Sequence, residues 1–108
     1  MKFSWPVMIR RVQGHSMVPI LPPGTVVFGW RWFVRLRPEK VVIFSRERRE
    51  TVKRIEHIEP KGLFVLGDHA DTSTDSRHYG AIPQDWVEAV VVWPRTTKVF
   101  ADETKVSN

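Results

Sequence analysis

The sequence predicts a mostly-β fold, a compact twisted sheet or partly closed barrel. Short runs of β-branched and aromatic residues recur along the chain, and glycines, prolines or charged residues separate them. No segment shows the apolar spacing of an amphipathic helix. The 108 residues suffice for one domain with a small core, which we expect over residues 1–94, followed by a polar tail over 95–108.

The expected elements follow the order of these runs. Residues 14–24 hold three prolines and two glycines, which predicts a turn-rich loop. We expect strands at residues 25–32, 40–44, 51–58, 63–66 and 87–93. Gly29 predicts a bulge in the first of them, and the charged residues 46–50 predict a solvated hairpin tip. In the last strand, alternation places Val87, Ala89, Val91 and Trp93 on one face.

Composition excludes several classes of protein. The chain has no cysteine, so disulfides and cysteine-ligated metals are excluded. Lys and Arg outnumber Asp and Glu by 17 to 12, and this balance suits a soluble basic protein, although it could also favour nucleic acid or an anionic membrane. Neither a membrane span nor a secretory signal is expected. Peripheral membrane association and a cytoplasmic location both stay open.

Residues 67–80, GDHADTSTDSRHYG, predict an ordered polar loop between two apolar runs. Short hydroxyl and carboxylate side chains bond readily to nearby backbone groups, and one arginine among three aspartates predicts internal ion pairing. A metal site is an alternative, because two histidines accompany the aspartates. However, the sixth position counted from Asp71 is not the glycine that a calcium loop requires. We therefore expect neither a metal nor a cofactor.

Lys53 lies inside a predicted strand, where alternation gives it the same face as Ile55 and His57. If that face is buried, desolvation lowers the pKa of the lysine, and a neutral amine can act as a general base toward a serine hydroxyl. The alternative is that the side chain extends to water.

Three segments, in this order, resemble the type I signal peptidase family of Ser/Lys proteases. They are Ser16-Met17-Val18-Pro19, Lys53-Arg54-Ile55, and Gly67-Asp68 with Ser73-Thr74-Asp75-Ser76-Arg77. The resemblance covers roughly residues 9–93. It implies the fold that the signal peptidases share with the self-cleaving LexA-type repressors, and a serine endopeptidase without a catalytic histidine.

The resemblance also implies a role for each matching residue. Ser16 matches the nucleophile, with its backbone N–H in the oxyanion hole, and Lys53 matches the general base. Ser73 matches the hydroxyl that orients the lysine amine. The remaining matches are Met17, an apolar residue on the substrate side, and three residues that structure the loop, Asp68, Asp75 and Arg77. The implied substrate is an extended peptide or preprotein, cut after small residues.

Some positions depart from the family pattern. Gly14 stands where some members carry a hydroxyl that supplies a second oxyanion donor, so no second donor is assigned. Neither the large inserted second domain nor the membrane anchor is expected. The chain is thus similar to compact members such as the maturation proteases of nickel superoxide dismutase. Two alternatives are a dedicated maturation protease for one substrate and a catalytically silent binding module on the same fold.

Aromatic residues and arginines interleave over residues 28–35. The aromatic side chains could simply pack in the core. Alternatively, Trp30, Trp32 and Phe33 could form an apolar rim against a membrane surface, where tryptophan and arginine are favoured. Nucleic-acid binding through these rings is a third class, and it is not expected beside the Ser/Lys segments.

Overall fold

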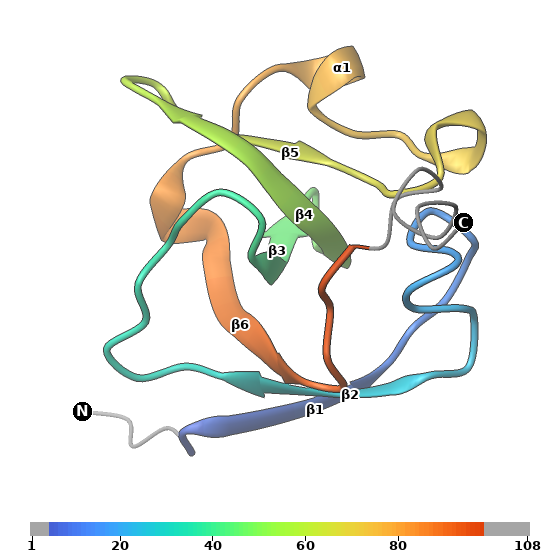
Figure 1. The fold of residues 1–108 in the computed structure, drawn as a ribbon. Helices are drawn as coiled ribbons and strands as arrows, with labels where there is room; N and C mark the ends of the chain where they lie inside the picture. Colours follow the sequence, from blue (N-terminus) through green and yellow to red (C-terminus); the bar gives the residue numbers. More distant parts are fainter. Residues whose placement is uncertain (1–4, 99–108) are drawn as a thin grey trace, which may run out of the picture.

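One antiparallel sheet of six strands forms the protein. The structure is a computed structural model that describes residues 5–98. The strands are ordered β1-β2-β6-β3-β4-β5, so β1 and β5 are the two edges and the sheet does not close (Figure 1). The predicted mostly-β fold is confirmed. No helix in the described part of the chain has the length and apolar character that crossing a membrane requires.

The strand bounds agree with the predicted runs to within two residues, with one addition. The strands are β1 (Val7–Arg11), β2 (Val26–Trp30), β3 (Val41–Arg46), β4 (Arg49–Glu59), β5 (Gly62–Leu66) and β6 (Val87–Trp93). The short elements are the 3₁₀ turn Ala70–Thr72, the single helical turn α1 (Ser76–Tyr79) and the 3₁₀ turn Gln84–Trp86. Strand β1 was not predicted, because its apolar residues occupy both faces and two arginines end it. The predicted polar tail lies mostly in 99–108, outside the described residues.

Strand β3 lies at the centre of the sheet, between β6 and β4. Its first four residues, Val41–Phe44, are all fully buried, because side chains cover both faces of the sheet here. Val41 and Ile43 belong to one apolar cluster, with Met8, Val12, Met17, Leu21, Val27, Ala89 and Val91. Val42 and Phe44 belong to the other, with Ile55, Leu63, Val65, Ile82 and Val90. The first cluster supports the Ser16 loop, and the second supports the strand that leads into the polar loop.

Two register shifts change which residues of β6 share a face. Ile43 pairs with Ala89 but Phe44 pairs with Val87, and Gly29 pairs with Val91 but Phe28 pairs with Trp93. Each shift leaves one residue of β6 unopposed and reverses the alternation beyond it. The prediction of one shared face is therefore wrong at both ends: Val87 packs against the second cluster, and Trp93 is exposed. A register shift does occur beside Gly29, but its extra residue, Val92, lies in β6, so the bulge expected at Gly29 itself is on the partner strand.

A third shift, between Ile55 and His57, corrects the predicted faces of β4. Lys53 and Ile55 are both buried as expected, but His57 is exposed and stacks on the Phe64 ring at 4.8 Å between centroids. The solvated tip is also shorter than predicted, because the turn is confined to residues 47–48. Glu50 belongs to β4 and forms an ion pair with Arg10 of the edge strand β1.

Candidate active site

Ser16 lies in the loop that joins β1 to β2. Met17, the next residue, is 1% exposed and packs in the core, and its carbonyl accepts a hydrogen bond from the Leu21 N–H at 2.8 Å. Two further backbone bonds of 2.8 Å, Val12 N–H to Thr25 and Gly24 N–H to Val12, close the base of the loop. The loop is therefore anchored, and Ser16 remains partly exposed beside a buried neighbour.

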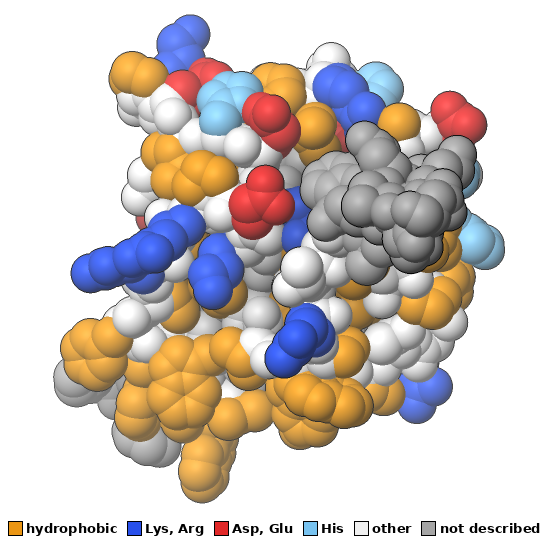
Figure 2. Space-filling view, viewed as in Figure 1, with side chains coloured by type: hydrophobic (Ala, Val, Ile, Leu, Met, Phe, Trp, Pro, Cys, Tyr) orange, Lys and Arg blue, Asp and Glu red, His pale blue; other side chains and the backbone are white. Residues whose placement is uncertain are grey.

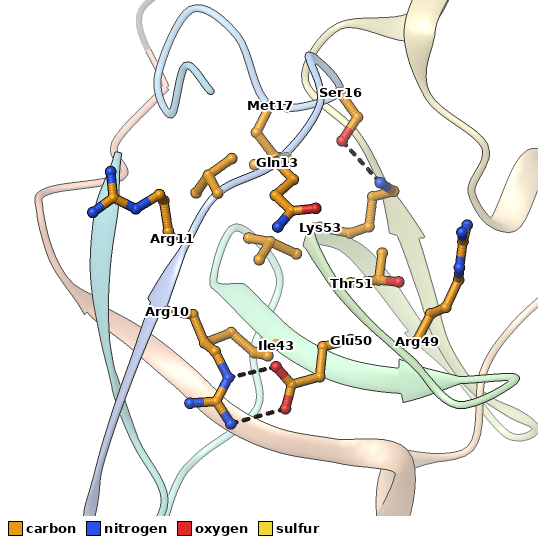
Figure 3. Close-up of a pocket in the computed structure, with 12 residues that line it drawn as sticks. Arg10, Arg11, Gln13, Ser16, Met17, Ile43, Arg49, Glu50, Thr51 and Lys53 are labelled. Carbon is orange, nitrogen blue, oxygen red and sulfur yellow. Dashed lines mark hydrogen bonds and ion pairs between the residues drawn. The ribbon is translucent and has the colours of Figure 1, made fainter. Parts of the chain in front are cut away.

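Lys53 reaches the Ser16 hydroxyl from β4. Its Nζ donates a hydrogen bond to Ser16 Oγ at 2.9 Å (Figure 3). The lysine is 5% exposed, so the alternative in which it extends to water is wrong. Burial lowers the pKa of the Lys53 amine below its ordinary value of 10.5, and the negative charge of Asp75 opposes this shift only in part. The amine therefore loses its proton more readily than an exposed lysine does.

Asp75 organises the polar loop from a fully buried position. Its Oδ2 accepts hydrogen bonds from the Ser73 hydroxyl at 2.6 Å and from the Gly67 N–H at 2.8 Å. Arg77 donates to both carboxylate oxygens, at 2.9 and 2.5 Å. Burial alone would raise the pKa of Asp75, but the hydrogen bonds from Arg77, Ser73 and Gly67 outweigh it and hold that pKa well below its ordinary value. The carboxylate is thus charged at neutral pH.

A second ion pair holds the start of the same loop to β4. Arg54 donates two hydrogen bonds to the Asp68 carboxylate, at 2.8 and 2.7 Å, and a third to the Glu39 carbonyl at 2.9 Å. The side chains of Arg54 and Asp68 are only 7% and 3% exposed. The sequence pattern alone predicts no role for Arg54. One feature of the sequence nevertheless points to such a role: Arg54 follows Lys53 inside a predicted strand, and a buried arginine needs an acidic partner.

Gly67 lies at the contact between the serine loop and the polar loop. A Cβ atom there would lie 2.2 Å from Ser73 Oγ and 2.7 Å from the carbonyl oxygen of Ser16. That carbonyl oxygen also accepts a hydrogen bond from the His69 N–H at 2.8 Å. The two loops therefore touch through backbone atoms, and the space between them admits only a glycine.

Ser73 differs from the sequence expectation in its contact. It is 5% exposed and next to Gly67, but its hydroxyl donates to Asp75. No hydrogen bond joins it to Lys53 in the part of the chain that the structure describes. The structure thus brings Ser16 and Lys53 together directly, and it ties Ser73, Asp75 and Arg77 into a separate network at the other side of Gly67.

A groove of about 590 Å³ runs from the Ser16–Lys53 contact between β1 and β4. Its lining residues are Arg10, Arg11, Val12, Gln13, Ser16, Met17, Ile43, Arg49, Glu50, Thr51, Val52 and Lys53. Figure 3 shows the Ser16–Lys53 pair at one end and the Arg10–Glu50 ion pair at the other. An extended chain segment laid along this groove would pass the Ser16 hydroxyl.

Comparison with family models gives a match to signal peptidase, peptidase S26, over residues 44–95. Over this segment, slightly less than half of the chain, the protein is similar to the signal peptidase family. The matched segment contains Lys53 and the whole polar loop, and it begins after the serine loop. This match supports a proteolytic function in general and peptide or preprotein substrates. A comparison with curated proteins gives no match.

The contact at Gly67 generates a stability prediction with a matched control. Gly67→Ala places a methyl group against the buried Ser73 side chain and the Ser16 carbonyl oxygen, so we expect the free energy of unfolding to fall by about 3 kcal/mol. Gly80→Ala meets no atom within 4 Å and is strained only by its φ of 83°, which costs about 1 kcal/mol. Urea unfolding of both variants measures the difference. Equal losses would contradict the close approach of the two loops.

Proposed function

We propose that this protein is a serine endopeptidase in which Ser16 is the nucleophile and Lys53 is the general base. The observation that carries the proposal is the 2.9 Å contact between Lys53 Nζ and Ser16 Oγ, made by a buried lysine whose pKa is lowered. A nucleophile and a base within hydrogen-bond reach are the geometric signature of covalent catalysis. The family match supports the reaction class.

The first half-reaction forms an acyl-enzyme. Neutral Lys53 takes the proton of the Ser16 hydroxyl while Oγ attacks the carbonyl carbon of the scissile bond. The negative oxygen that develops accepts a hydrogen bond from the Ser16 backbone N–H, which bonds to no other group in the described part of the chain. The Lys53 ammonium then gives its proton to the leaving amine, and the C–N bond breaks.

The second half-reaction returns the enzyme to its starting state. Lys53, again neutral, takes a proton from a water molecule whose oxygen attacks the acyl carbon. The C–Oγ bond breaks, Ser16 Oγ recovers the proton, and the peptide leaves as a carboxylic acid. Each half-reaction thus uses the same amine first as a base and then as an acid.

Ser73 and Asp75 stabilise the protonated form of Lys53 during each half-reaction. Asp75 acts through its charge, which raises the pKa of the lysine. The Ser73 hydroxyl donates its hydrogen bond to Asp75, and this leaves its oxygen lone pairs available as acceptors for the ammonium. This arrangement gives Ser73 an orienting role without a hydrogen bond to the neutral amine.

The groove suits an extended peptide. Among the described residues, β1 pairs only with β2, and the part of β4 before Arg54 pairs only with β3. Both strands therefore offer unpaired backbone groups, to which an extended peptide can add as a further strand. Val12, Met17 and Val52 supply apolar surface beside Ser16. We propose that the residues just before the cut are small.

Alanine and methionine substitutions test the proposed dyad. Ser16→Ala and Lys53→Met should each lower cleavage of a signal-peptide-type substrate by at least about a thousandfold, because nucleophile and base act as a unit. Ser73→Ala should reduce it less. The measurement is product formation in detergent, followed by mass spectrometry, and the control is Lys61→Met, which removes an exposed lysine from a turn.

The outcomes separate the alternatives. Undiminished cleavage by Ser16→Ala or Lys53→Met would contradict the proposed dyad. Cleavage of one cognate propeptide, with no turnover of general signal peptides, would favour a dedicated maturation protease similar to those of nickel superoxide dismutase. Peptide binding with no cleavage of any substrate by the wild-type protein would favour a silent binding module.

The lowered pKa of Lys53 predicts the direction of the pH profile. The amine must be neutral to accept the Ser16 proton, so kcat/KM should rise with pH and level off above the pKa of Lys53, at a pH below 10.5. The folded state binds this proton less tightly than the unfolded chain, so stability should also rise with pH between the two pKa values. Initial rates and urea unfolding across pH 5–10 measure both, and a flat rate profile would count against Lys53 as the base.

We also propose that an aromatic rim contacts a membrane surface. Phe33 is fully exposed, and Trp30 and Trp32 are 39% and 37% exposed, so these three rings lie at the surface and not in the core. In Figure 2, apolar side chains gather along the lower edge of the molecule, with basic side chains above them. A pocket beside Trp30 and Phe33 is lined by the basic residues Arg35, Arg37 and Lys40. Aromatic rings flanked by cations suit an anionic lipid surface.

Vesicle binding tests the rim. The wild-type protein should sediment with vesicles of mixed phosphatidylcholine and phosphatidylglycerol, and Phe33→Ser with Trp30→Ser should reduce the bound fraction several-fold. Trp86→Ser is the control, because Trp86 is as exposed as Trp30 but lies in the 3₁₀ turn before β6. Equal binding by all three proteins would overturn the assignment of the rim.

A further inference from the structure

The groove beside Ser16 carries an excess of positive charge. Three arginines line it, Arg10, Arg11 and Arg49, and Glu50 is the one carboxylate among its described lining residues. Glu50 is already engaged, because Arg10 donates to both of its oxygens, and this pairing lowers the pKa of Glu50. Glu50 therefore neutralises Arg10, and the positive charges of Arg11 and Arg49 have no matching carboxylate among the described lining residues.

Arg11 and Arg49 are both exposed, and neither has an ion pair or side-chain hydrogen bond with any residue that the structure describes. Figure 3 shows them on opposite sides of the groove, Arg11 on β1 and Arg49 on β4. A guanidinium group binds a carboxylate through two parallel N–H donors, so an acidic side chain is the natural ligand for either one. A basic side chain at the same place would be repelled.

The position of the charge along the groove follows from the strand. Arg49 lies four residues before Lys53 in β4, which corresponds to about 13 Å of extended chain. A peptide laid along β4 advances at about the same rate per residue, so its third or fourth residue from the cut comes level with Arg49. Closer to Ser16 the lining combines apolar Val12, Met17 and Val52 with the uncharged polar side chains of Gln13 and Thr51.

We propose that the groove selects peptides with an acidic side chain three or four residues from the cleaved bond, attracted by Arg49, with Arg11 on the opposite side adding to the positive charge. The inference rests on the proposed peptidase function and adds the substrate class. The apolar part of the groove accepts the residues next to the cut, and the arginines discriminate among peptides farther out. Because both arginines are solvated, the selection is by modest electrostatic attraction and weakens with salt.

A matched peptide set tests the inference in two ways. Each peptide shares one cut site and carries a single Glu, Gln or Lys at positions one to five on either side of it. The first readout is kcat/KM with the wild-type protein, and the second is the Kd of the same peptides for Ser16→Ala by fluorescence anisotropy. The variants are Arg11→Gln and Arg49→Gln, alone and together, with Arg49→Glu as a charge reversal.

The control is Arg48→Gln, which removes an exposed arginine from the adjacent turn, outside the groove lining. We expect Glu at position three or four on one side of the cut to improve kcat/KM about 2- to 5-fold over Gln for each arginine. Lys there should be correspondingly worse. The double variant should lose the preference, Arg49→Glu should reverse it toward Lys, and Arg48→Gln should keep it.

The two readouts distinguish failure of this inference from failure of the proposed function. Equal cleavage of Glu, Gln and Lys peptides, dependent on Ser16, would overturn the acidic preference and leave the peptidase intact. Absence of all cleavage, together with tighter binding of Glu peptides that Arg11→Gln and Arg49→Gln abolish, would support the acidic preference and overturn the peptidase. Binding without charge preference would overturn the inference on its own.

Discussion

The buried carboxylate of Asp75 is the constraint on which the candidate site depends. A carboxylate without exposure to water is costly unless hydrogen bonds compensate it. Here Ser73, Gly67 and Arg77 all donate to it. The bond from the Gly67 N–H fixes the position of Gly67, which in turn lies against the backbone of Ser16. The position of the serine is therefore set by a network that begins with a residue 59 positions later in the chain.

The same network controls the electrostatics around Lys53. The lysine is moved out of water by β4 and by the second apolar cluster, and this lowers its pKa. The charges nearest to Lys53 are already paired with other residues. Asp75 forms an ion pair with Arg77, and Arg54 forms one with Asp68. Arg54 is adjacent to Lys53 but faces Asp68, so the neighbouring cation is neutralised. A lysine with access to the Ser16 hydroxyl and no tightly bound counter-ion is the result.

The sequence predicted the fold and the contact at the site better than it predicted faces and edges. Runs of β-branched and aromatic residues bounded by turn residues located five strands, because the buried parts of β3, β5 and β6 are continuous apolar runs. Alternation failed where a bulge intervened, at His57, Val87 and Trp93, because a register shift depends on the partner strand and leaves little local signal. The partners of Arg54 and Glu50 lie 14 and 40 residues away. Such pairings cannot be seen in the local pattern.

The last strand of the chain joins the two parts of the sheet that carry the site. β6 is the last strand in the chain, yet it lies between β2 and β3. The β1–β2 hairpin carries the Ser16 loop, and β3, β4 and β5 carry Lys53 and lead into the polar loop. Within the sheet, only β6 joins these two halves (Figure 1). Without residues 87–93 the two halves share no strand pairing in the described part of the chain, so the last strand in the sequence is the one that completes the sheet beneath the candidate site.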